Sequence, residues 1–201
     1  LLIDAGAAFG TGRHETTRGC LLALDRLARA GWHFENVLDL GCGSGVLALA
    51  AGKLWRGAVL AVDNDPDAVR VARENAALNG LETHVSVLRS QGYGAPGIRR
   101  RAPFDLISAN ILASPLVRMA AALSRHLAPG GRAVLSGLLR SQEGEVLAAH
   151  LREGLGLDFR LRLGDWSVLV LRKPGRARRV PDKPKRRLRG ERRRLASASP
   201  G

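Results

Sequence analysis

The sequence has few cysteines and few aromatic residues. Its 201 residues include two cysteines, Cys20 and Cys42, with four Phe, three Trp and one Tyr. Two cysteines cannot form a disulfide framework, and no Cys/His cluster has the spacing of a zinc site. A hydrophobic content of 45% with so few aromatic rings predicts one globular domain with an aliphatic core. We expect no structural metal.

Long apolar runs are also missing. No stretch reaches the eighteen or so apolar residues that a membrane-spanning helix needs. The chain does not start with a basic segment followed by an apolar one, which is the pattern of a secretory signal. We therefore expect a cytoplasmic protein that makes no contact with a membrane.

Positive charge is abundant but confined to one end. The net charge is +14, and thirteen Lys or Arg residues with only two acids lie between Arg172 and Arg194. That segment supplies +11 and leaves about +3 for residues 1–171, an ordinary value for an enzyme domain. We predict a folded domain over 1–173 and a basic, disordered tail over 174–201. The tail either contacts RNA or the ribosome, or is a solvated extension.

Hydrophobic periodicity predicts alternating strands and helices. Ser44 is a candidate N-cap for the second helix, and Asp65 with Pro66 is the start signal of the third. The expected helices cover residues 14–30, 44–54, 66–80, 115–127 and 142–153, and the expected strands cover residues 36–40, 58–62, 83–88, 104–109, 133–136, 158–163 and 166–171.

Strands that alternate with amphipathic helices favour a parallel sheet covered on both faces. The last two strands are joined only by Gly164 and Asp165, a link so short that they must form an antiparallel hairpin. The expected fold is doubly wound α/β, with a mostly parallel seven-stranded sheet and a C-terminal antiparallel hairpin. This ending is typical of Rossmann-like class I methyltransferases rather than of nucleotide-dependent dehydrogenases.

A glycine-rich turn follows the first strand, where doubly wound proteins commonly bind their ligands. Gly41, Gly43 and Gly45 allow a sharp turn and close approach of a ligand, and Asp63 ends the neighbouring strand. A carboxylate there suits the two hydroxyls of a ribose, so an adenosine-containing cofactor is expected. The dinucleotide fingerprint requires Gly or Ala where this chain has Val46, which weakens the NAD alternative. A tight turn without a ligand is the remaining alternative.

Four passages resemble the ribosomal protein L11 methyltransferase family, whose members trimethylate amino groups of a large-subunit ribosomal protein. The resemblance extends from about residue 1 to Lys173. The passages are IDAGAAFGTGRHETT at 3–17, DLGCGSGVLA at 39–48, VDNDP at 62–66 and ANIL at 109–112.

The resemblance implies S-adenosylmethionine as cofactor and a large-subunit ribosomal protein as substrate. It implies that Thr17, Gly41, Asp63 and Asn110 contact the cofactor. Gly43 is a further candidate for cofactor binding because it belongs to the same turn. A loop over 9–12 that includes Phe9 and Thr11 is expected to cover the cofactor. The chain departs from the family pattern at Ala5, Arg13 and Glu15. Family members also carry a separate amino-terminal recognition domain, and this chain is expected to begin where their catalytic domain begins.

Asn110 is the candidate catalytic residue, because it ends a strand that should open onto the same crevice. Its amide could accept a hydrogen bond from an amine substrate or orient the cofactor, and the alternative is a buried Asn that caps the next loop. His14 is interpreted as a structural residue at a helix start, and Cys42 as a packed thiol.

The expected function is methyl transfer to a lysine side chain or an α-amine of a ribosomal protein. An RNA methyltransferase that uses the basic tail is the main alternative, although Asn110-Ile111-Leu112 lacks the Pro-Pro-aromatic sequence typical of enzymes that methylate base amines. A third alternative is a non-catalytic, cofactor-binding remnant without its recognition domain.

Overall fold

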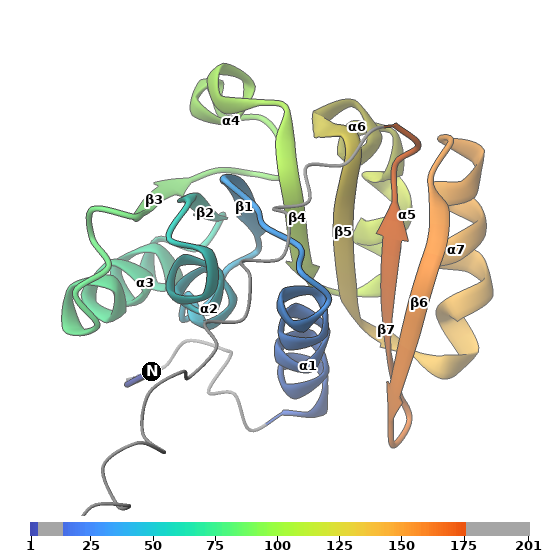
Figure 1. The fold of residues 1–201 in the computed structure, drawn as a ribbon, viewed down its shortest axis with the longest axis horizontal. Helices are drawn as coiled ribbons and strands as arrows, with labels where there is room; N and C mark the ends of the chain where they lie inside the picture. Colours follow the sequence, from blue (N-terminus) through green and yellow to red (C-terminus); the bar gives the residue numbers. More distant parts are fainter. Residues whose placement is uncertain (4–13, 176–201) are drawn as a thin grey trace, which may run out of the picture.

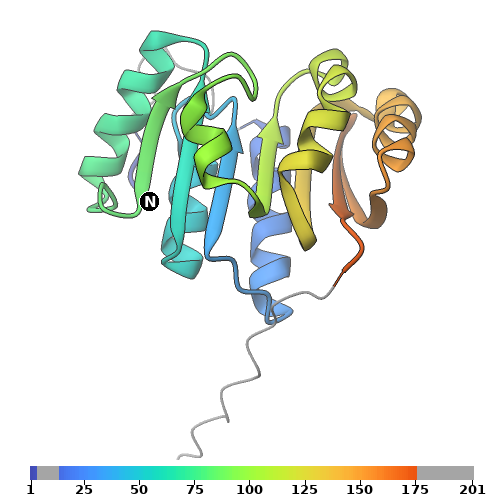
Figure 2. The same ribbon diagram turned by 90° about the horizontal axis from the view of Figure 1, so that it is seen from above.

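A computed structural model describes residues 1–3 and 14–175. Seven strands form one sheet in the order β3-β2-β1-β4-β5-β7-β6, and helices lie on both faces (Figures 1 and 2). The strands are β1 (Asn36–Leu40), β2 (Ala58–Asp63), β3 (Val85–Arg89), β4 (Phe104–Asn110), β5 (Leu127–Leu139), β6 (Gly156–Leu163) and β7 (Trp166–Arg172). The helices are α1 (Glu15–Arg29), α2 (Val46–Trp55), α3 (Pro66–Leu78), α4 (Pro96–Arg101), α5 (Ala113–Arg118), α6 (Ala120–His126) and α7 (Glu143–Arg152), with a 3-10 turn η1 (Arg140–Gln142).

The sheet topology confirms the expected fold class. β1 pairs in parallel with β2 and β4, β2 with β3, and β4 with β5, whereas β7 pairs antiparallel with β5 and β6. Helices α1 to α3 pack in one aliphatic core and α4 to α7 in the other. The strand order reverses between β1 and β4, so the crevice at their carboxyl ends is where a ligand is expected.

Helix starts follow local signals where a polar side chain stands at the cap. Asp65 is the N-cap of α3, accepts a hydrogen bond from the backbone N–H of Asp67 at 2.9 Å, and is followed by Pro66 as predicted. The predicted cap at Ser44 is wrong. The N-cap of α2 is Gly45, whose φ of 82° lies in the left-handed region that favours glycine.

Two other expectations need correction, and one helix was missed. The helix predicted over 115–127 is two short helices, α5 and α6, separated at Met119. β5 is longer than predicted because its start passes through Pro129, Gly130 and Gly131, residues that give no strand signal, where the register with β4 shifts. The six-residue helix α4 follows Pro96 and was not predicted, since six residues are too few to show helical periodicity.

The C-terminal hairpin forms as expected, with Leu163 paired to Trp166 across the Gly164-Asp165 turn. Because β7 runs against the parallel strands, it ends at the edge opposite the crevice, where the N–H of Lys173 donates to Gly131 O at 3.1 Å. The tail predicted over 174–201 falls almost entirely outside the described residues. No helix in the described part of the chain is long and apolar enough to cross a membrane.

Candidate functional site

The glycine turn after β1 is built from backbone contacts. The N–H groups of Gly41 and Cys42 both donate to Val62 O, at 2.8 and 3.0 Å, so the turn is tied to the neighbouring strand β2. Gly41 and Gly43 have φ angles of 71° and 53°. A Cβ on Gly41 would lie 2.4 Å from Cγ2 of Ile111, so another residue at position 41 would have to displace that side chain and adopt an unfavourable positive φ.

Asp63 lies at the end of β2 and faces this turn. Its Oδ2 accepts a hydrogen bond from the N–H of Gly43 at 2.9 Å, and its Oδ1 accepts one from the N–H of Asp65 at 3.1 Å. Each carboxylate oxygen has a second lone pair for another donor. Asp63 therefore shapes the turn and still has acceptor capacity for a ligand.

A second carboxylate supports the turn from inside the core. Asp39 is buried, and it accepts hydrogen bonds from Ser108 Oγ at 2.7 Å and from the N–H of Ala48 at 3.1 Å. Burial raises the pKa of Asp39 to about 6, and the two hydrogen bonds oppose that rise. Cys42 is also buried, and burial raises the pKa of its thiol well above the ordinary value. A buried thiol with a raised pKa agrees with the packed role expected for Cys42.

A cavity of about 540 Å³ opens beside the turn at the carboxyl edge of the sheet, and Gly41 and Asp63 line it. The sequence analysis did not predict most of the residues that line this cavity. The further lining residues are Leu40, Asn64, Ser90, Gln91, Gly92, Tyr93, Gly94, Ile111, Pro115, Arg118, Met119 and Ala122.

The segment from Ser90 to Gly94 could have been found from the sequence. It directly follows β3, and the N–H of Ser90 donates to Asp63 O at 2.8 Å. In a parallel sheet, the residues after each strand meet at the same edge, so this segment belongs beside Asp63. Arg118 and Met119 carry no comparable signal, because they reach the cavity from the junction of α5 and α6 and not from a strand end.

Asn110 and Thr17 meet although they are 93 residues apart. Asn110 ends β4 and Thr17 lies in the first turn of α1, and Asn110 Nδ2 donates to Thr17 Oγ1 at 3.2 Å. Asn110 Oδ1 is buried and has no hydrogen-bond partner among the described residues. Neither residue lines the cavity, but the next residue, Ile111, does so and packs against Gly41. The structure thus presents an unused, buried acceptor close to the glycine turn.

The remaining candidates divide into those that the structure places and those that it does not. His14 is the N-cap of α1, its Nδ1 lies 2.8 Å from Thr16 Oγ1, and its ring packs edge-on against Trp166. Phe9 and Thr11 lie outside the described residues. In residues 1–3 and 14–175, no three His, Cys, Asp or Glu side chains are grouped as metal ligands.

Comparison with known proteins gives one consistent result. Residues 1–174 match the family model described as ribosomal protein L11 methyltransferase (PrmA). A relative of that name from Bradyrhizobium diazoefficiens is 54% identical over 173 residues, which are 86% of this chain and 58% of the relative. One from Brucella suis is 48% identical over 170 residues, 85% of this chain and 59% of the relative. The chain therefore spans less than two thirds of the length of these relatives.

The comparison with solved structures agrees with this family match. The ribosomal protein L11 methylase of Lactobacillus delbrueckii subsp. bulgaricus has a TM-score of 0.75 and 34% identity, and the match covers 85% of this chain and 84% of that one. An RNA methyltransferase from Salinibacter ruber in complex with S-adenosyl-L-homocysteine has a TM-score of 0.59 and 21% identity, covering 81% of this chain and 95% of that one. The second likeness concerns the fold alone.

Proposed function

Because this chain belongs to the ribosomal protein L11 methyltransferase family, we propose that it transfers methyl groups from S-adenosylmethionine to amino groups of a large-subunit ribosomal protein. The observation that carries this proposal is the buried, unused Asn110 Oδ1 near a glycine turn and a cavity to which Asp63 contributes a carboxylate. Such a reaction belongs in the cytoplasm, where ribosomes work.

The described residues fit the cofactor. Asp63 has acceptor capacity for the two ribose hydroxyls, and Gly41 and Gly43 keep side chains away from the ligand. The start of α2, with Gly45 at its N-cap, offers backbone N–H groups and positive partial charge to a carboxylate. A cavity of about 540 Å³ lies within the range of small-molecule sites. Gly41, Gly43 and Asp63 would hold the cofactor, with Thr17 and Asn110 beside it and Phe9 and Thr11 covering it.

The main chemical task of the chain is to align the acceptor amine with the methyl group. When bound, S-adenosylmethionine supplies a methyl group on a good leaving group, so no strong base is needed at the transfer step. Asn110 Oδ1 would accept a hydrogen bond from the acceptor amine and direct the amine lone pair toward the methyl carbon. Thr17 Oγ1 holds the other end of the Asn110 amide.

The acceptor amine must lose a proton before it reacts. A lysine amine has a reference pKa near 10.4, and an apolar environment or a nearby cation lowers it. Product formation should therefore rise between about pH 7 and 9. A rate that stays flat over this interval would argue against an amine nucleophile.

The central experiment uses labelled S-adenosylmethionine with total ribosomes, followed by separation of protein from RNA. Label in a large-subunit protein supports the proposal. Label only in RNA would overturn it in favour of an RNA methyltransferase, and cofactor binding without any turnover would favour a non-catalytic remnant.

Cofactor binding is tested separately with Asp63→Ala in a calorimeter. Loss of two charge-assisted hydrogen bonds should weaken S-adenosylmethionine binding about 100-fold. Asp67→Ala is the matched control, because Asp67 is an exposed acid in the first turn of α3 and does not line the cavity. Equal affinity for both variants would remove Asp63 from the site.

The basic tail supports a second contact. The family match ends at residue 174, while most of the positive charge lies beyond it. We propose that the tail binds RNA phosphates of the ribosome in a salt-dependent manner. Deleting residues 176–201 should raise the KM for ribosomes at low salt and leave the KM for isolated acceptor protein unchanged. An unchanged KM for ribosomes would mark the tail as a solvated extension.

A further inference from the structure

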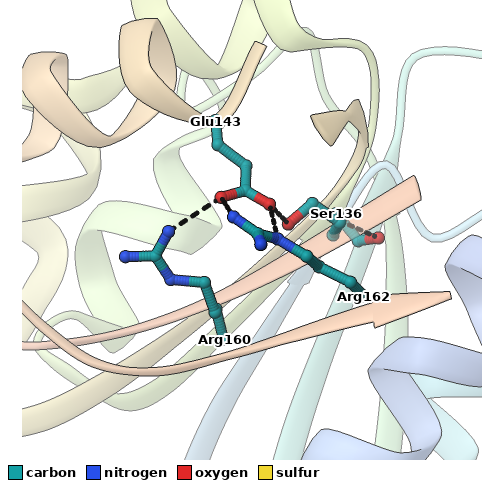
Figure 3. A network of polar contacts seen from close by, with 5 residues as sticks. Ser136, Glu143, Arg160 and Arg162 are labelled. Carbon is teal, nitrogen blue, oxygen red and sulfur yellow. Dashed lines mark hydrogen bonds and ion pairs between the residues drawn. The ribbon is translucent and has the colours of Figure 1, made fainter. Parts of the chain in front are cut away.

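Glu143 is a buried carboxylate outside the cofactor site. It is the first residue of α7, and its side chain is 7% exposed. Its Oε1 accepts hydrogen bonds from Arg162 Nε and Ser167 Oγ, both at 2.7 Å. Its Oε2 accepts from Arg162 Nη2 at 2.8 Å and from Arg160 Nη1 at 2.9 Å. Figure 3 shows the carboxylate between the two guanidinium groups of β6.

These partners keep Glu143 charged despite its burial. Hydrogen bonding from Arg162 is the largest cause that lowers the pKa of Glu143 to about 2, and burial opposes it. The two arginines are half-exposed, so they remain hydrated while they hold the buried carboxylate. The cluster therefore fastens the start of α7 to the C-terminal hairpin at every physiological pH.

Ser167 connects this cluster to the candidate site. Ser167 donates its hydroxyl to Glu143 and accepts a hydrogen bond on its backbone carbonyl from Ser136 Oγ at 3.1 Å. Ser136 is the register partner of Asn110 in the β4–β5 pair, and its carbonyl accepts from the N–H of Ile111 at 3.1 Å. Glu143 thus reaches the strand end that carries Asn110 through two serines.

The same cluster reaches Thr17 from the other side. Ser136 Oγ lies 3.4 Å from the carbonyl oxygen of Thr16, the residue before Thr17. Trp166 precedes Ser167 and packs against His14, the N-cap of the helix that carries Thr17. Both partners of the Asn110–Thr17 hydrogen bond are therefore held against the hairpin that Glu143 fastens.

We propose that Glu143 is a positioning residue that sets the geometry of the Asn110–Thr17 pair through Ser167 and Ser136. The inference rests on the proposed function, because its readout is methyl transfer. Misplacement of an aligning group by about 1 Å can cost up to about 100-fold in rate, so a remote fastening of this kind is measurable.

The test compares Glu143→Gln with Glu145→Gln in the full chain. Glu145 lies in the same first turn of α7 and is exposed, so its substitution makes the same charge change outside the cluster. At saturating S-adenosylmethionine and well below the unfolding midpoint, Glu143→Gln should lower kcat/KM for the ribosomal acceptor about tenfold. Glu145→Gln should change it less than twofold. Equal values for the two variants would overturn the inference.

A double-mutant cycle separates positioning from general weakening. In a Thr17→Val background the Asn110–Thr17 hydrogen bond is absent, so adding Glu143→Gln should lower the rate less than twofold further. A full tenfold further loss would show that Glu143 acts elsewhere and would overturn the inference.

Ser167→Ala provides a second variant if Glu143→Gln does not fold. It removes the hydroxyl that donates to Glu143, and it retains both arginine pairs and the Ser136 hydrogen bond to the backbone carbonyl of residue 167. About a threefold loss is expected in the wild-type background, with none in the Thr17→Val background. Wild-type activity of Ser167→Ala would overturn the inference. No turnover by the wild-type chain would instead contradict the proposed function, so the two failures are distinguishable.

Discussion

Asp39, Asp63 and Asp65 on the β1–β2 side of the sheet each accept hydrogen bonds from backbone N–H groups, whereas Glu143 and Asp158 on the β5–β7 side accept them from arginine side chains. Asp39, Asp63 and Asp65 accept hydrogen bonds from backbone N–H groups 9, 20 and 2 residues away. Glu143 accepts from arginines 17 and 19 residues away, and Asp158 from Arg132 26 residues away at 2.6 Å. The first arrangement shapes a turn, and the second fastens strands to each other and to a helix.

The two arrangements have opposite electrostatic consequences. Backbone N–H and hydroxyl dipoles compensate the burial of Asp39 only in part, so its pKa rises to about 6. Two guanidinium groups compensate Glu143 more than fully, so its pKa falls to about 2. The turn side, which comprises β1, β2 and the glycine turn, therefore contains a carboxylate, Asp39, whose charged form burial disfavours. The hairpin side, which comprises β5 to β7 and the start of α7, contains a carboxylate, Glu143, whose charged form its partners favour.

The largest expected effect is on the hairpin side. Glu143→Ala leaves Arg160 and Arg162 without their acceptor and leaves the buried Ser167 hydroxyl unpaired. Breaking a buried pair costs 3 to 5 kcal/mol, and the half-exposed arginines reduce this to about 3 kcal/mol in the free energy of unfolding. Urea unfolding at pH 7 measures it, with Glu145→Ala as control. If Glu143→Ala lowers the free energy of unfolding by less than about 1 kcal/mol, the Glu143 cluster stabilises the fold no more than an exposed ion pair does, and the proposed contrast with the turn side fails.

A smaller effect depends on pH and distinguishes the two carboxylates by sign. The native pKa of Asp39 is raised from 3.8 to about 6, so its stabilising contribution is complete below about pH 4 and is lost as pH rises through 6. Relative to Asp39→Asn, the wild type should gain about 2 kcal/mol between pH 7 and pH 4. Urea unfolding at both pH values measures this difference.

Glu143 provides the opposite control for that experiment. Its native pKa is lowered from 4.5 to about 2, so its contribution is present above pH 4.5 and is lost as pH falls toward 2. The difference between wild type and Glu143→Gln should therefore be constant from pH 7 to pH 5. The same pH dependence for both variants would contradict the assigned signs.

The smallest expected effect concerns a local cap on the turn side. Asp65→Ala removes the side-chain acceptor at the start of α3 and should lower the free energy of unfolding by about 1 kcal/mol. Asp67→Ala, in the first turn of the same helix, should cost only a few tenths of a kcal/mol. If Asp67→Ala costs as much in urea unfolding, the cap is not the source of the stabilisation.

The turn side could be predicted closely, because its contacts are local. Gly41, Gly43, Asp63 and the Asp65-Pro66 start signal all follow directly from strand ends and helix caps. The predicted N-cap at Ser44 was wrong. The sequence shows which residues could cap a helix, but the backbone angle at Gly45 decides where the cap lies. Helix α4 and the glycine-rich start of β5 were missed because neither shows a periodic pattern.

By itself, the sequence determined the strand and helix alternation, the hairpin and the glycine turn, since each depends on residues a few positions apart. Only the tertiary structure decided which distant side chains meet. Asn110 contacts Thr17 across 93 residues, Arg118 and Met119 reach the cavity from the junction of α5 and α6, and Glu143 of α7 lies between two arginines of β6. Such contacts depend on strand order and register, which place residues together without leaving a local pattern in the chain.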